Sequence, residues 1–81
     1  MNGLPPRRRA VLVALRDIQT ETGGYPPTVR EIGDRLGMRL PSTVQKHIDE
    51  LVRHGFVERR GSRRVITPSG WSALGERLVR G

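Results

Sequence analysis

The sequence predicts a mainly α-helical domain with one small β-hairpin. Two helix-start patterns, at Thr28 and near Pro41, open short segments with apolar stripes, and Gly37 lies in the turn between them. Residues 56–67 are centred on a glycine turn and have the composition of a hairpin. The length of 81 residues fits one small core, and the absence of cysteine excludes disulfides and cysteine-bound zinc.

The chain is strongly basic, which limits the class of partner. Its net charge is +7 and its pI is about 11.6, and 14 of its 15 basic residues are arginine. Such a balance favours a polyanion, most often nucleic acid and sometimes a membrane surface. The longest apolar run, residues 10–15, is far too short to cross a bilayer, and no secretory signal precedes it. We therefore expect a soluble, cytoplasmic, nucleoid-associated protein with no membrane partner.

Residues 1–6 are expected to form a flexible arm, and the first helix to run from about residue 7 to 22. Pro6 suits its first position, where the missing N–H costs nothing. Arg7 and Arg8 belong to a basic run at the end of the helix that the helix dipole makes unfavourable for positive charge. They either contact phosphates or form a solubilising face, and the residues leave both interpretations open.

The next helix begins after a stiff proline connector, in which Tyr25 is expected to be a core or staple residue and not a ligand contact. Thr28 and Glu31 form a capping-box pattern, and Gly37 suits a left-handed C-terminal cap. The apolar stripe of this helix comprises Val29, Ile32 and Leu36.

A further helix follows Pro41, with Ser42 or Thr43 as its expected cap, and ends before Gly55. Its buried stripe comprises Val44, Ile48, Leu51 and Val52. With that stripe inward, the side chains of the first turns reach base edges in a DNA major groove. The expected base-reading residues are Ser42, Thr43, Gln45 and Lys46. Asp49 and Glu50 are expected to pair with Arg53 and His54, four residues further along.

A basic hairpin is predicted around the turn at Gly61 and Ser62. Residues 59–64 contain four arginines and no acid, so we expect phosphate contacts, although charged hairpin tips are also common on protein surfaces. The expected contacts with the DNA backbone are Thr28, His47, Arg53, Arg59, Arg60, Arg63, Arg64, Arg7 and Arg8.

The last predicted helix covers residues 68–80 and begins with Thr67 as its cap. Gly70 and Gly75 weaken it by roughly 1 kcal/mol each, so it needs tertiary packing. Its apolar stripe packs either on residues 7–22 of the same chain or on a symmetry mate, and comprises Trp71, Leu74, Leu78 and Val79.

This order of elements defines a winged helix-turn-helix, here a single domain over residues 1–81. It consists of a three-helix unit, a basic two-stranded wing and an extra C-terminal helix. Catalytic motifs are lacking: there is no glycine-rich phosphate loop, and His47 and His54 do not have the spacing of a metal pair. We expect no enzyme activity, no metal and no cofactor.

Residues 24–58 closely resemble the N-terminal DNA-binding domain of LexA-type SOS repressors. The resemblance rests on GYPPTVREIG, on STV..H at the start of the second helix of the motif, and on the entry to the wing. It implies that the four expected base readers lie at operator-reading positions. The tail, VITPSGWSAL, is more similar to MarR-like winged helices. Leu40 and Pro41 stand where many relatives carry serines, so the operator sequence is not carried over.

The function predicted is sequence-specific binding of double-stranded DNA by a bacterial or phage transcriptional regulator, a repressor by the resemblance, acting as a homodimer on DNA. LexA repressors continue into a serine–lysine self-cleaving domain that this chain lacks, so we expect sensing by self-cleavage to be unavailable to it. Two alternatives stay open: a DNA-binding module of replication or recombination, and a winged helix used for protein association.

Overall fold

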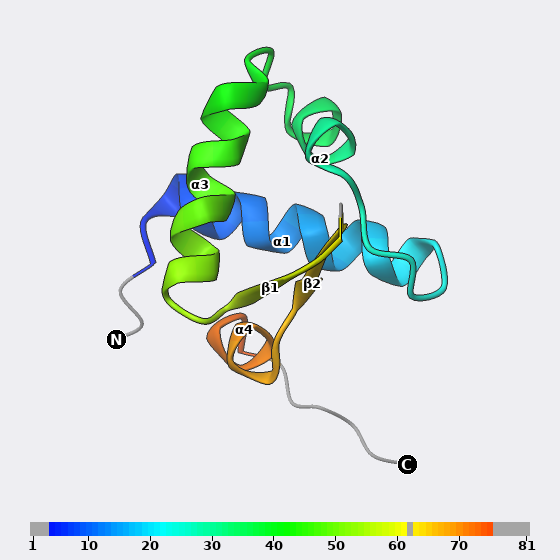
Figure 1. Ribbon diagram of the computed structural model, residues 1–81, viewed down its shortest axis with the longest axis vertical. Coiled ribbons are helices and arrows are strands. Elements are labelled where there is room, and N and C mark those ends of the chain that lie inside the picture. Colours follow the sequence, from blue (N-terminus) through cyan, green and yellow to red (C-terminus); the bar gives the residue numbers. More distant parts are fainter. Residues whose placement is uncertain (1–3, 62, 76–81) are drawn as a thin grey trace.

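A computed structural model describes residues 4–61 and 63–75 of the chain. Its elements are α1 (Pro6–Glu21), α2 (Val29–Leu36), α3 (Pro41–Arg53), β1 (Val57–Arg60), β2 (Arg63–Ile66) and α4 (Pro68–Ala73). Figure 1 shows α3 crossing α1, with α2 beside them, and the hairpin β1–β2 following the C-terminal end of α3. This arrangement confirms the predicted winged helix-turn-helix. No helix in the described ranges is long and apolar enough to cross a membrane.

One hydrophobic core joins the three helices to the base of the hairpin. Leu4, from the segment expected to be a flexible arm, packs against it, and α1 begins at Pro6 as expected. The buried apolar residues are Val11, Leu12, Ala14, Leu15, Ile18, Ile32, Val44, Ile48, Leu51, Val57, Ile66 and Leu74. The expected inward stripe of α3 is thus confirmed at its first three positions, and Val52 is half-buried.

The predicted capping of α2 is confirmed at both ends. Thr28 N–H donates to Glu31 Oε1 at 2.8 Å, and Glu31 N–H donates to Thr28 Oγ1 at 3.3 Å. At the other end Gly37 takes a φ of 71°, the left-handed conformation that glycine adopts without strain. These caps fix where α2 begins and ends, and Gly37 begins the turn to α3 that a helix-turn-helix requires.

The start of α3 differs from the sequence-based prediction. Its N-cap residue is Leu40, with no side-chain capping bond, and Pro41 takes the first helical position. The expectation that Ser42 or Thr43 caps the helix is therefore wrong. Because the fixed φ of proline favours the first turn, the helix starts early enough to place both residues inside it.

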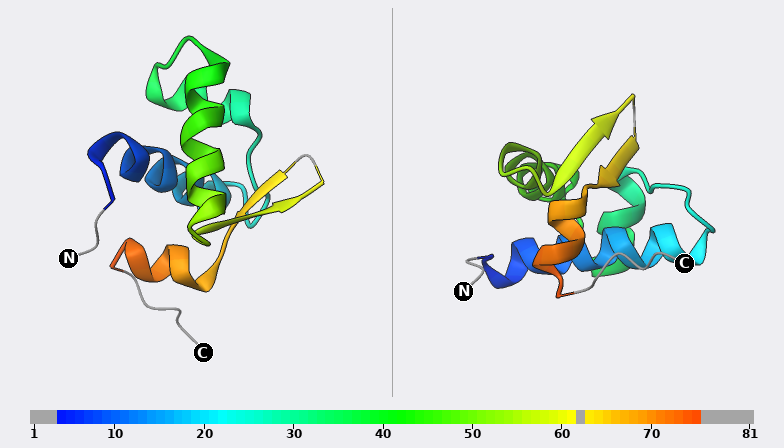
Figure 2. Two further views of the ribbon diagram at one scale, coloured as in Figure 1. Left: turned by 60° about the vertical axis from the view of Figure 1, so that its left-hand side comes forward. Right: turned by 90° about the horizontal axis from the view of Figure 1, so that it is seen from below.

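The hairpin is antiparallel, and its buried residues lie at its base. Val57 pairs with Ile66, and both are buried, whereas Arg59 pairs with Arg64 and Arg60 with Arg63. The part of the hairpin that carries the paired arginines lies beyond the core. Figure 2 shows the hairpin projecting away from the helices toward its tip.

Helix α4 is shorter than predicted. Thr67 caps it as expected, with its Oγ1 accepting from Gly70 N–H at 3.1 Å. The helix ends at Ala73, and Gly75 follows with a φ of 78° in the left-handed region. The predicted continuation, with Leu78 and Val79, lies outside the described residues.

The described part of α4 packs on its own chain. Leu74 is buried in the core, and Trp71 is half-buried against it. The guanidinium of Arg9 donates to the Ala73 carbonyl at 3.3 Å, which ties α1 to the end of α4. Of the two packings left open by the sequence, these contacts belong to the intramolecular one.

Candidate nucleic-acid interface

The exposed face of α3 carries the residues expected to read bases. Ser42 and Lys46 are exposed, and Thr43 and Gln45 are half-buried. At 100° per residue, Ser42 and Lys46 lie opposite the buried stripe, and Thr43 and Gln45 lie on opposite flanks of that face. All four therefore border one accessible surface at the N-terminal half of the helix.

The first turn of α1 adds positive charge beside this surface. The pKa of His47 is lowered, first by partial burial of its ring and then by the charges of Arg8, Arg7 and Lys46. Helix α1 packs against α3, so the charges of Arg7 and Arg8 act on a side chain of α3. The lowered pKa favours the neutral form of the His47 ring.

Arg8 of this cluster retains unused hydrogen-bonding capacity. Its Nε is buried, and no group in the described ranges accepts a hydrogen bond from it. Arg9, the next residue, instead turns toward the Ala73 carbonyl. In the basic run at the start of α1, Arg7 and Arg8 thus act on α3, whereas Arg9 contacts α4.

The opposite flank of α3 is joined to the hairpin by Asp49. Its Oδ1 accepts a hydrogen bond from Gln45 Nε2 at 2.8 Å and another from Arg59 Nη2 at 3.2 Å. The expected pairing of Asp49 with Arg53 is therefore wrong. Sequence reasoning missed this role of Asp49, although the i,i+4 spacing from Gln45 is a known helix signal. No local pattern indicated that Arg59, ten residues away, would also bind Asp49.

Glu50 makes the ion pairs on the other flank. Its Oε2 lies 3.6 Å from Arg53 Nη1, and its Oε1 lies 3.6 Å from His54 Nε2. The pairing predicted between Glu50 and His54 is thus confirmed, while Arg53 pairs with Glu50 in place of Asp49. Arg53 keeps its side chain at the surface.

The four hairpin arginines have different surroundings. Asp49 and Glu58 provide counter-charges to Arg59 and Arg60, with 3.6 Å between Arg60 Nη2 and Glu58 Oε1. The mutual repulsion of the hairpin arginines is therefore offset partly by α3. Arg64 is half-buried. We find Arg60 the more exposed of the two paired cations, with 66% of its side chain accessible against 56% for Arg59.

Arg63 is held by the connector before α2. It donates to the Pro26 carbonyl at 2.8 Å, and its guanidinium carbon lies 6.0 Å from the centroid of the Tyr25 ring. Tyr25 is 69% exposed, so its expected place in the core is wrong. Its partner comes from a distant strand, which no local pattern indicated. Nearby, the Thr28 hydroxyl is occupied as the acceptor of the α2 cap.

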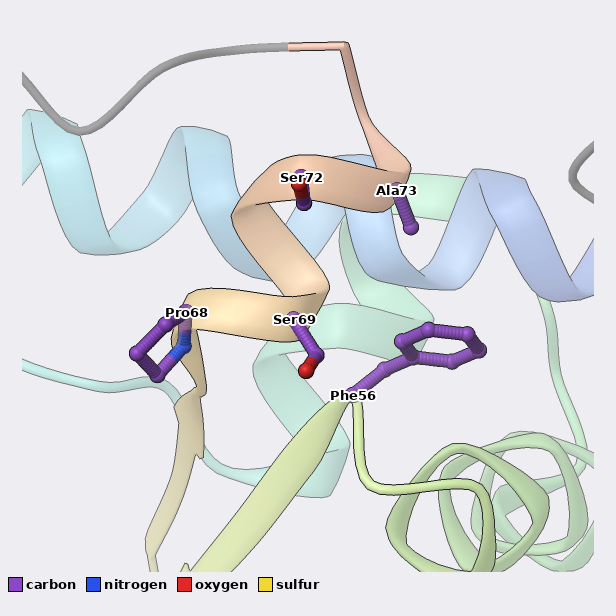
Figure 3. A pocket seen from close by; sticks show the side chains of 5 residues that line it. All are labelled: Phe56, Pro68, Ser69, Ser72 and Ala73. Atoms are coloured by element: carbon purple, nitrogen blue, oxygen red, sulfur yellow. The ribbon is translucent and has the colours of Figure 1, made fainter.

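A hollow of about 550 Å³ lies elsewhere, where α4 meets the start of β1. Figure 3 shows its lining residues, Phe56, Pro68, Ser69, Ser72 and Ala73. None of them belongs to the expected DNA surface, and none is charged. Within the described residues, no three potential metal ligands gather in one place.

Comparison with known proteins places the chain in a family. The model of the LexA DNA binding domain matches residues 1–64, which include all three helices of the helix-turn-helix unit and most of the hairpin. The chain belongs to the LexA DNA-binding domain family. The match extends beyond residues 24–58, on which the resemblance was first based.

Several LexA repressors are similar to the chain. That of Geotalea uraniireducens is 46% identical over 71 residues, which cover 86% of this chain and 35% of the relative. That of Pediococcus pentosaceus is 47% identical over 55 residues, covering 64% of this chain and 26% of the relative. That of Corynebacterium jeikeium is 40% identical over 60 residues, covering 74% of this chain and 22% of the relative. The chain thus spans about a third or less of the length of these relatives.

Proposed function

We propose that the chain binds double-stranded DNA, with α3 in the major groove and the hairpin along the backbone. In this proposal it represses transcription and is associated with the nucleoid. The membership of the LexA DNA-binding domain family supports DNA binding, and the relatives named LexA repressor support repression. The observation that carries the proposal is the distribution of charge. Cations from α1 and from the hairpin flank the exposed face of α3 on its two sides.

Base reading falls to the exposed face of α3. Lys46 donates to guanine, Gln45 contacts adenine or another base with an exocyclic amino group, and Ser42 and Thr43 contact either strand or a thymine methyl. The geometry that supports these roles is the position of all four residues in the first two turns, opposite or beside the buried stripe.

Backbone contacts fall to the flanking cations. Arg8 and His47, both half-buried, lie on one side, and the exposed guanidinium of Arg60 lies on the other. Phosphate contacts position a protein on the duplex without selecting sequence. The remaining members of the proposed backbone set are Thr28, Arg7, Arg53, Arg59, Arg63 and Arg64.

We further propose that two copies occupy a pseudo-palindromic site. One recognition helix contacts only a few base pairs, and paired helix-turn-helix units commonly bind half-sites about one helical turn apart. Sedimentation on a selected palindrome and on a single half-site tests this directly. A complex of two chains per palindrome is expected, and one chain per palindrome at saturation contradicts it.

The experiment that tests the function is selection from a random duplex library, followed by titration at several salt concentrations. A defined sequence should be enriched, and log K should fall linearly with log salt as counterions are released. Enrichment of no sequence, together with salt-dependent binding to every duplex, contradicts a sequence-specific regulator. Absence of binding at low salt contradicts the DNA-binding function itself.

A further inference from the structure

Asp49 connects the proposed base-reading helix to the hairpin through a single oxygen. Both Gln45 Nε2 and Arg59 Nη2 donate to its Oδ1, at 2.8 and 3.2 Å. Half of the Asp49 side chain is exposed, so this carboxylate lies at the surface that the proposed function assigns to DNA. Arg59 offsets its charge, which would otherwise repel a phosphate backbone.

The carboxylate fixes the direction of the Gln45 amide. An ionised carboxylate only accepts hydrogen bonds, so the NH₂ group of the amide must face Asp49. The Gln45 oxygen is then directed away from Asp49 and is available as an acceptor. In the major groove, the exocyclic amino groups of adenine and cytosine are the donors that such an acceptor meets.

We propose that Asp49 is a specificity-determining positioning residue, which orients Gln45 so that α3 favours a base pair presenting an exocyclic amino group at one position. A glutamine without this restraint turns its amide either way and accepts from or donates to the base. The restrained amide loses that freedom, so it discriminates more strongly. The inference rests on the proposed function, because it concerns the same DNA-facing surface.

The chain offers a matched control in Glu58. It is also an acid paired with a hairpin arginine, and 54% of its side chain is exposed against 50% for Asp49. Its partner is Arg60, and this ion pair involves no proposed base reader. Asp49→Ala and Glu58→Ala therefore remove the same charge from similar surroundings, and only the first frees Gln45.

Wild type, Asp49→Ala, Glu58→Ala and Gln45→Ala are each taken through the same duplex selection at one salt concentration. Both acid variants should bind random duplex more tightly by a similar factor. Asp49→Ala alone should lose discrimination of roughly tenfold at one base pair, and Gln45→Ala should lose it at the same position. Retained preference at that position in Asp49→Ala overturns the proposal, as does an equal loss in Glu58→Ala.

The side-chain amide of Gln45, followed by NMR in the free protein, separates this inference from the proposed function. Its NH₂ signals should move toward those of a free glutamine in Asp49→Ala and stay in place in Glu58→Ala. Unmoved signals in Asp49→Ala overturn the positioning role, even where the wild type selects a clear DNA site. If the signals move in Asp49→Ala but the wild type enriches no DNA sequence, the proposed function has failed. The specificity role then fails with it.

Discussion

Helix α3 and the hairpin β1–β2 both border the proposed DNA surface, but they are held in place differently. Three side chains anchor α3 along its length, and Val44, Ile48 and Leu51 are fully buried. The hairpin has Val57 and Ile66 at its base. Beyond them, its position depends on polar contacts of arginines with neighbouring elements.

The difference indicates how the two regions divide the work of recognition. A helix fixed by close packing holds side chains precisely enough to discriminate base edges. A projecting hairpin that carries arginines suits phosphate contacts, which tolerate small displacements. The arginines are nevertheless unequal, because Arg63 is bonded to a carbonyl and Arg60 faces solvent beside Glu58.

The largest effect is expected at the foot of the hairpin. A Cβ on Gly70 would lie 2.3 Å from the Phe56 carbonyl oxygen and 2.6 Å from Ile66 Cγ2. Gly70→Ala should therefore lower the free energy of unfolding by about 3 kcal/mol, whereas the exposed neighbour Ser69→Ala should change it by less than about 0.5 kcal/mol. Urea denaturation of both variants measures the difference. Equal stabilities would mean that this junction does not hold the hairpin tightly.

The same deletion in each region measures how firmly its side chains are packed. Val44→Ala removes two methyl groups from a fully buried site on α3 and should cost about 2 kcal/mol of unfolding free energy. Val65→Ala makes the same change at a half-buried hairpin site and should cost less than about 1 kcal/mol. Denaturant midpoints compare the two variants directly. A hairpin deletion as costly as the helix deletion would contradict the view that the apolar packing of the hairpin is concentrated at its base.

The inequality of the arginines is measurable in the salt dependence of DNA binding. Arg60→Ala should lower the slope of log K against log salt by about 0.9, the value for one neutralised phosphate. Arg63→Ala should lower it by less than half of that, because the Pro26 carbonyl and the Tyr25 ring hold its guanidinium. Titrations at four salt concentrations give both slopes. Equal reductions would show that the contact with Pro26 yields to DNA.

The smallest effect concerns His47 and pH. Its pKa in the free fold lies below the ordinary value of 6.5, so the unfolded chain binds more protons below that pH. The stability contributed by its neutral form is complete above pH 6.5 and is lost as the pH falls through the pKa of the folded protein. Thermal melts at pH 7 and pH 5.5 should therefore differ less in His47→Gln than in the wild type. An unchanged difference would remove His47 from this linkage.

DNA should act on His47 in the opposite direction. A phosphate beside Arg7 and Arg8 offsets the charges that hold the pKa down, so the complex binds more protons than the free protein. Affinity should accordingly rise as the pH falls through the pKa of His47 in the complex. His47→Gln should flatten that rise.

The fold was predictable from the sequence wherever the decisive contacts are local. The Thr28–Glu31 capping box and the left-handed Gly37 depend on a few neighbouring residues, and both were predicted. The start of α3 was misplaced by the competition between capping side chains and Pro41, which the proline decides. Tyr25 was misplaced because its environment depends on Arg63, in another element.

The sequence was sufficient to predict which side chains of α3 face outward, but not which hydrogen-bond partners they have. The period of the buried stripe placed Ser42 and Lys46 outward on α3. Gln45 and Arg59 both donate to Asp49. The bond from Arg59 depends on how the hairpin lies against α3, which no sequence pattern specifies. Gly70, expected only to weaken α4, proved necessary for the close approach of that helix to Phe56.

The division of labour between α3 and the hairpin is tested most directly by comparing Lys46→Ala with Arg60→Ala on two duplexes, the selected site and a scrambled sequence. Lys46→Ala should lose about 1–3 kcal/mol of binding free energy on the selected site, with little change on the scrambled one. Arg60→Ala should weaken binding to both duplexes by the same factor. Uniform loss in Lys46→Ala, or a loss confined to the selected site in Arg60→Ala, would contradict the account.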